Sequence, residues 1–142
     1  MKSMTTKKRF CLQCDNGTAL EFGARDIRGD IDGVAYFVPA VQGWHCPVCG
    51  DIEFIQDDDS SERLSAAMEA AATTARTQRA QTLRATRKKL KLSQAEAGVL
   101  FGGGVSAFSE YEHGKTQPHK STVLLFQLLD HHPELLKELR PA

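Results

Sequence analysis

The four cysteines of this sequence form two identical pairs, Cys11-x-x-Cys14 and Cys46-x-x-Cys49, with 31 residues between the pairs. Each pair makes a knuckle that directs two thiolates at one ion, and two knuckles complete the tetrahedral set of four sulfurs that zinc favours. Four thiolates leave no coordination position open for water or substrate. The spacing therefore predicts one structural zinc ion per chain, and it offers no support for an enzyme.

Two other uses of the cysteines remain open. A pair of disulfides would suit an oxidising compartment, whereas the sequence Cys46-Pro47-Val48-Cys49-Gly50 is similar to a rubredoxin knuckle, which would hold iron and carry electrons. His45 is predicted to be a surface residue and not a fifth ligand, because four sulfurs already suffice.

The segment that carries the cysteines, from residue 11 to about residue 55, is rich in glycine, which predicts short strands such as 34–38 and 41–44 joined by turns. The 31 residues between the pairs are expected to form hairpin structure, with Trp44, Tyr36 and Phe37 in a small core. So few residues bury too little apolar surface for stability, and the metal offsets that deficit.

An acidic, polar break at 56–61 offers serine N-caps and precedes an alanine-rich stretch. The composition of residues 63–81 predicts a helical linker, because helix propensity is high and large apolar residues are few. Whether this linker is a rigid helix or a flexible hinge stays open.

Sharper helix signals follow residue 90. Ser93 and Glu96 have the S-x-x-E spacing of a capping box, and Gly102-Gly103-Gly104 should end that helix. A second short helix is predicted over about 105–112, before Gly114. Two short helices joined by a glycine turn, with basic residues upstream, predict a helix-turn-helix that binds double-stranded DNA.

In such a unit the second helix lies in the major groove. Val105, Phe108 and either Tyr111 or Glu112 are expected to serve its core side, so the opposite polar set, Ser106, Ser109 and Glu110, is the candidate for reading bases. The candidates for contacts with the DNA backbone are Gln94, Lys115, Thr116, Gln117, His119 and Lys120. Four further basic residues are expected to contact phosphates or to add long-range attraction: Arg87, Lys88, Lys89 and Lys91.

The next predicted helix, 123–129, is apolar nearly all round and must therefore be covered on more than one side. Its residues Val123, Leu124, Phe126 and Leu128 are candidates for the domain core or for a homodimer interface. Dimerisation would supply the two-fold symmetry that palindromic operators require. Pro133 is expected to begin a last short helix over 134–139.

Charge divides the chain although its formal net charge is zero. Residues 1–62 hold 6 Lys/Arg against 11 Asp/Glu, and residues 63–142 hold 12 against 7. The basic half suits phosphates, and the acidic half suggests a different partner. No apolar run approaches the length of a membrane span and the start lacks a secretory signal, so a cytoplasmic protein without a membrane partner is expected.

These signals together predict an α+β protein. Residues 1–10 are a flexible lead-in, 11–62 a β-rich zinc-binding domain and 63–81 the helical linker. Residues 82–142 are an all-α, five-helix domain for DNA binding and dimerisation. A zinc-ribbon transcriptional regulator would satisfy every feature considered so far.

Three longer motifs indicate a resemblance to a known protein family. The segments CPVCGDIEF, LSQAEAGVLFGGGVSAFSEYEHGKTQP and LLDHHPELLKEL make the chain resemble the MqsA-type antitoxins, also called the YgiT-like zinc-finger type, of bacterial type II toxin–antitoxin systems. The resemblance implies a zinc domain, with Cys11, Cys14, Cys46 and Cys49 as ligands, that binds and neutralises an mRNA-cleaving ribonuclease toxin.

The same resemblance implies a C-terminal helix-turn-helix domain of the Xre or lambda-repressor kind that dimerises and represses its own operon. The family pattern places Asn and Arg on the base-reading face, whereas this chain has Ser106 and Glu110 there. A different operator sequence is therefore expected, since arginine typically reads guanine and glutamate accepts from the cytosine amino group. The alternative that stays open is a zinc-ribbon helix-turn-helix regulator without a toxin partner.

Overall fold

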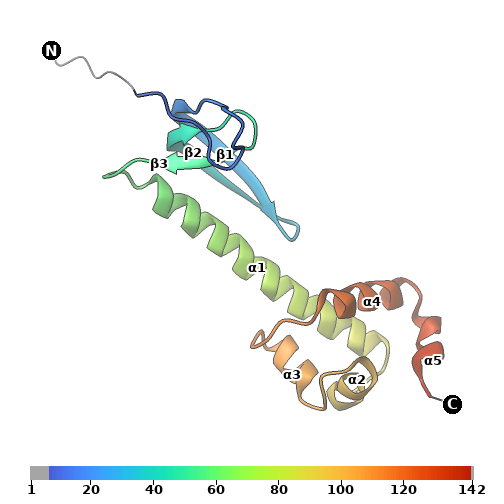
Figure 1. Cartoon of the computed structure of the whole chain (residues 1–142). Helices are drawn as coiled ribbons and strands as arrows, with labels where there is room; N and C mark the ends of the chain where they lie inside the picture. The colour runs from blue at the N-terminus through green and yellow to red at the C-terminus, as the bar shows by residue number, and fades with distance from the viewer. Residues whose placement is uncertain (1–6, 142) are drawn as a thin grey trace. The chain divides into compact units, whose positions relative to one another are not determined.

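The computed structural model describes residues 7–141, which form a three-stranded antiparallel sheet followed by five α-helices (Figure 1). The fold is thus mixed α/β, with the strands in the first part of the chain. The chain divides into two compact units, Met1–Ala72 and Thr73–Ala142. Of the predicted lead-in, residues 1–6 lie outside the described part, and the Arg9 carbonyl accepts a hydrogen bond from the Leu20 N–H.

The sheet consists of β1 (Glu21–Ile31), β2 (Val34–His45) and β3 (Ile52–Phe54), in the order β1-β2-β3. A two-residue turn joins β1 to β2, and Asp32 and Gly33 both adopt the positive φ of a type I′ hairpin turn, 49° and 87°. The predicted hairpin between the cysteine pairs is confirmed. The expectation of two separate short strands at 34–38 and 41–44 is wrong, because both belong to one strand that bends at Ala40, where φ is 49°.

The first turn of α1 (Ser60–Lys89) is tied to this bend. The buried Ser60 hydroxyl accepts from the Gln42 N–H at 2.8 Å, and the Arg63 guanidinium donates to the carbonyls of Pro39 and Ala40. The predicted helical linker, 63–81, lies within this single helix of 30 residues. Among its described residues the first unit buries few large apolar side chains, of which Val41 is fully enclosed and Val38 is nearly so.

The second unit contains α2 (Gln94–Phe101), α3 (Ala107–Glu112) and α4 (Lys120–His131), then a 3-10 turn over Pro133–Leu135 and α5 (Leu136–Leu139). The capping box is confirmed, since the Ser93 hydroxyl accepts from the Glu96 N–H and the Glu96 carboxylate accepts from the Ser93 N–H. Helix α4 begins three residues earlier than predicted, with His119 at its N-cap.

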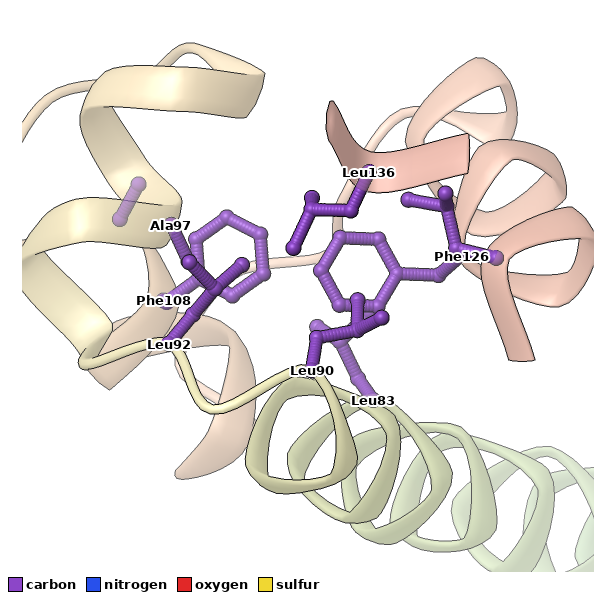
Figure 2. Close-up of a cluster of buried hydrophobic side chains, with 9 residues drawn as sticks. Leu83, Leu90, Leu92, Ala97, Phe108, Phe126 and Leu136 are labelled. Atoms are coloured by element: carbon purple, nitrogen blue, oxygen red, sulfur yellow. The ribbon is translucent and has the colours of Figure 1, made fainter. Parts of the chain in front are cut away.

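One apolar cluster holds these helices together (Figure 2). Phe108 and Leu129 are fully enclosed, and the Phe126 ring lies 5.3 Å from that of Phe108, centroid to centroid. The other members come from α1 and the turn that follows it, from α2, from the start of α3 and from α5: Leu83, Leu90, Leu92, Ala97, Ala107 and Leu136. Across the part of the chain that the structure describes, no helix combines the length and apolar character that crossing a membrane requires.

Candidate metal centre and candidate nucleic-acid interface

Both cysteine pairs adopt the same knuckle. The Cys14 N–H points at the Cys11 sulfur at 3.4 Å, and the Cys49 N–H points at the Cys46 sulfur at 3.5 Å. The residue after each pair turns the chain back with a positive φ, which Gly50 supplies in the second knuckle and Asp15 in the first. The sheet brings the knuckles together, because β1 and β2 return the chain from the first pair to the second.

All four sulfurs lie within 4.8 Å of one another, so the cluster could hold one metal ion. The Cys11 and Cys49 sulfurs are 3.5 Å apart, and those of Cys14 and Cys46 are 3.8 Å apart. A zinc ion with thiolates at about 2.3 Å separates its sulfurs by about 3.8 Å at the corners of a tetrahedron. The cluster therefore has the size of a four-thiolate site, and every cysteine in it is a free thiol.

Hydrogen bonding gives the thiols of the cluster different pKa values. The Cys49 N–H lowers the pKa of the Cys46 thiol to about 6, because it stabilises the thiolate. The Cys49 thiol is the largest cause that raises the pKa of Cys14 to about 12. Four negative sulfurs this close are not stable by themselves, and a divalent cation is the group that would allow all four to ionise. The donor set thus fits a metal ion.

The prediction that His45 is a surface residue is wrong. Only 2% of it is exposed, and Nε2 lies 2.9 Å from the Val41 carbonyl oxygen and 3.1 Å from that of Gly23. Its ring therefore bridges β1 and β2 directly beside the cysteine cluster. The alternating pattern of β2 was the available signal, since His45 shares a face with the buried Val41.

The aromatic residues near the cluster only partly form a core. Phe37 is exposed, contrary to prediction, and the Arg28 guanidinium lies over its ring at 4.4 Å. Tyr36 and Trp44 are half-buried. Phe22 and Trp44 pair across the sheet with their centroids 5.2 Å apart, so this face carries an aromatic surface.

In the second unit, a tight turn sets α3 against α2. Gly102, Gly103 and Gly104 all have φ near +90°, which side chains disfavour. A Cβ on Gly98 would overlap the Gly104 carbonyl, so the backbone of the turn rests directly on α2. This close approach fixes the start of α3, although α3 has only six residues.

The candidate base-reading residues share one accessible side of α3. Ser106 is exposed and its hydroxyl makes no capping bond, while Ser109 and Glu110 are half-buried. The Glu110 carboxylate accepts a long hydrogen bond from the Thr116 hydroxyl, at 3.5 Å. Phe108 is in the core as predicted, but Val105 is not, since 66% of it is exposed. The reason is that α3 begins at Ala107 and leaves Val105 in the preceding turn.

Of the six residues expected to contact the DNA backbone, three make side-chain hydrogen bonds within the protein. The Gln94 amide donates to the Glu112 carboxylate at 2.8 Å, and Gln117 accepts from Arg79 at 3.2 Å. Thr116 contacts Glu110 as described above. The remaining three are exposed: Lys115, His119 and Lys120.

Two of the upstream basic residues have protein partners. Arg87 donates through Nη2 and Nε to Glu112, at 2.8 Å and 3.1 Å, and through Nη1 to the Leu92 carbonyl at 2.7 Å. Its side chain is 10% exposed and that of Glu112 is 3% exposed. This pair locks the end of α1 to α3, a role that the sequence analysis missed. Lys89 pairs with Asp130 at the surface, whereas Lys88 and Lys91 are exposed.

Helix α4 divides the candidate core or dimer residues between two environments. Phe126 is buried and Val123 is half-buried, whereas Leu124 and Leu128 are 51% and 48% exposed. The two leucines are four residues apart and therefore form an apolar stripe on the outer side of α4.

Comparison with known proteins identifies one family. Residues 9–140 match the family described as the antitoxin component of bacterial toxin–antitoxin system, MqsA. The chain is 39% identical to Antitoxin MqsA of Escherichia coli (strain K12) over 132 residues, which cover 92% of this chain and 98% of that protein. The matched relative is an antitoxin, a regulatory protein, in agreement with the prediction that this chain is not an enzyme.

Proposed function

This chain belongs to the MqsA family of antitoxins from bacterial toxin–antitoxin systems, and from that membership we propose a protein with two binding activities. The first unit neutralises a cognate ribonuclease toxin that cleaves mRNA. The second unit, as a dimer, represses the chain's own operon by binding specific double-stranded DNA. The observation that carries the proposal is the match over residues 9–140, which includes both units.

Charge supports the assignment of the toxin to the first unit. Residues 1–72 hold 7 Lys/Arg against 12 Asp/Glu, a net charge of −5. A ribonuclease must attract the RNA backbone, so its binding surface is basic and complementary to this unit. Leu12 and Val48, on the two knuckles, are exposed and add apolar contact area. Zinc held by the four cysteines keeps both knuckles in place for this contact.

The second unit has the opposite balance. Residues 73–142 hold 11 Lys/Arg against 6 Asp/Glu, a net charge of +5, which suits the phosphates of DNA. We assign α2 and α3 as a helix-turn-helix, with the accessible side of α3 in the major groove. Ser106, Ser109 and Glu110 then reach base edges, where Glu110 accepts a hydrogen bond from an exocyclic amino group.

Dimerisation uses the apolar stripe on α4. Leu124 and Leu128 are too exposed to contribute fully to their own domain core, and a two-fold contact would cover them with the same residues of a second copy. The paired α3 helices would then meet two half-sites of one operator.

The experiment is co-expression of the tagged chain with the gene adjacent to its own, followed by affinity purification and a growth assay. A small ribonuclease should co-purify, and its toxicity should be relieved by the full chain. A variant with Cys46→Ser should lose both effects, whereas Gln127→Lys, on α4, should retain them. If nothing binds and growth is unaffected, the toxin assignment is refuted and the chain is a zinc-ribbon regulator of transcription.

A further inference from the structure

Val105 is an apolar side chain with no place in the core. It is 66% exposed, while the next two apolar residues along the chain, Ala107 and Phe108, are buried in the central cluster. Single exposed apolar residues are common and need no function. Val105 differs from other exposed apolar residues in its position, because it directly precedes Ser106, the first residue on the polar side of α3.

The backbone at Val105 is held firmly. A Cβ on Gly98 would lie 3.4 Å from the Val105 Cα and would overlap the Gly104 carbonyl, so this stretch packs directly on α2. The close contact places the main chain of Val105 against the protein and leaves its side chain to solvent. A side chain presented from a fixed backbone loses little additional freedom on binding.

The neighbouring polar groups are also available. The Ser106 hydroxyl makes no capping bond, and one turn later the Glu110 carboxylate accepts a long hydrogen bond from Thr116 at 3.5 Å. Valine, serine and glutamate therefore follow one another along the accessible side, without an arginine or lysine among them. Such a surface lacks the bidentate donor that reads guanine, and it offers instead a methyl-bearing side chain beside hydrogen-bonding groups.

Thymine is the base that this combination fits. In the major groove thymine alone presents a C5-methyl group, which apolar side chains recognise by contact. We propose that Val105 is a specificity residue that contacts the C5-methyl of one thymine in each operator half-site. The inference rests on the proposed placement of α3 in the major groove, and it adds a residue and a base to that proposal.

The test deletes the same contact from both sides. The preferred operator is first selected from random duplexes with the full, zinc-loaded chain, and each thymine is then replaced by uracil, which lacks only the methyl group. Affinities are measured for the unmodified chain, for Val105→Ala and for Val99→Ala. Val99 is the matched control, because it is also an exposed valine, 72% exposed, but lies in α2 beside Leu100 and Leu139.

At one thymine per half-site, uracil should weaken binding by about fourfold, the value expected for one buried methyl group. Val105→Ala should bind the thymine duplex more weakly by a similar factor and should no longer distinguish uracil at that position. Val99→Ala should behave as the unmodified chain. If Val105→Ala keeps the full sensitivity to uracil at every thymine, or if no thymine is sensitive, the inference is overturned. If the unmodified chain selects no duplex, the proposed DNA-binding function itself fails, and the inference with it.

Discussion

The Arg87–Glu112 pair allows a quantitative test of how the second unit is stabilised. Arg87→Met and Glu112→Leu each remove one member of a pair whose side chains are 10% and 3% exposed. The remaining charged group then stays in the protein interior without its partner. Removal of one member of a buried pair costs about 3–5 kcal/mol of unfolding free energy.

The double substitution should cost less than either single one. Without both charges, the two apolar side chains fill similar volume and no ion is left buried. The cost that remains comes from two groups: the Leu92 carbonyl loses the Nη1 donor at 2.7 Å, and the half-buried Gln94 amide loses its Glu112 acceptor at 2.8 Å. An acceptor left without its donor accounts for about 1–3 kcal/mol, so the two substitutions should be coupled by several kcal/mol.

Urea unfolding of the full, zinc-loaded chain can measure these differences with two probes. Circular dichroism at 222 nm follows the helices, most of which belong to the second unit. Fluorescence follows Trp44, the only tryptophan of the chain, which lies in β2 of the first unit. The helical transition should move to lower urea in each single variant, while the Trp44 transition should stay in place.

Lys89→Met is the control, because it breaks a surface pair with Asp130 whose side chains are 50% and 44% exposed. Such a pair contributes about 0–1 kcal/mol. If Arg87→Met is no more destabilising than Lys89→Met, the buried pair has no special role. If the double variant costs the sum of the two single variants, the reasoning on uncompensated charge is refuted.

Three further predictions concern the metal, acid stability and the dimer. Cys46→Ser should abolish stoichiometric zinc in the purified chain and remove the cooperative Trp44 fluorescence transition, while a helical transition remains by circular dichroism. The pKa of Glu96 is lowered from 4.5 by the Ser93 N–H, so its stabilising effect is present above pH 4.5 and is lost as the pH falls through the folded value. In Glu96→Gln this part of the acid sensitivity should be absent from pH-dependent thermal unfolding, and an unchanged pH profile would contradict the capping role. Leu128→Lys should weaken self-association by more than about tenfold in sedimentation, because a charge would enter an apolar contact. Gln127→Lys should leave self-association unchanged. If the two variants behave alike, the stripe of Leu124 and Leu128 is not the dimer contact.

The cluster of four cysteines is the part of the candidate site that the sequence predicts best. Two C-x-x-C pairs have a local geometry that needs no long-range information, and the hairpin between them follows from the same spacing. The length of the strands was missed although a signal for it exists, since Asp32-Gly33 is a preferred type I′ dipeptide. Burial of His45 was missed although the alternation along β2 places it on the same face as Val41, whereas its contact with the Gly23 carbonyl joins two strands and has no local signal.

The helical unit shows a different limit. The capping box at Ser93 and the glycine turn fix where α2 begins and ends, because both signals are local. The ion pair of Arg87 with Glu112 joins residues 25 positions apart, and the basic run around Arg87 gives no indication that one member turns inward. A cluster of charges on a helix predicts a solvated surface, and only packing of α1 against α3 selects the exception.

The short length of α3 also limits what can be predicted from the sequence. Helix α3 spans fewer than two turns, so an error of two residues at its start moves Val105 from the solvent to the core. Because α3 is so short, different residues stabilise it and face the solvent. Phe108 and Glu112 hold α3 in place from its inner side, while Val105, Ser106 and Glu110 are free of the apolar cluster. If α3 enters the major groove as proposed, substitutions among these three would change which bases are read without altering the fold that presents them, and a chain with the scaffold of its relatives would in that way select a different operator.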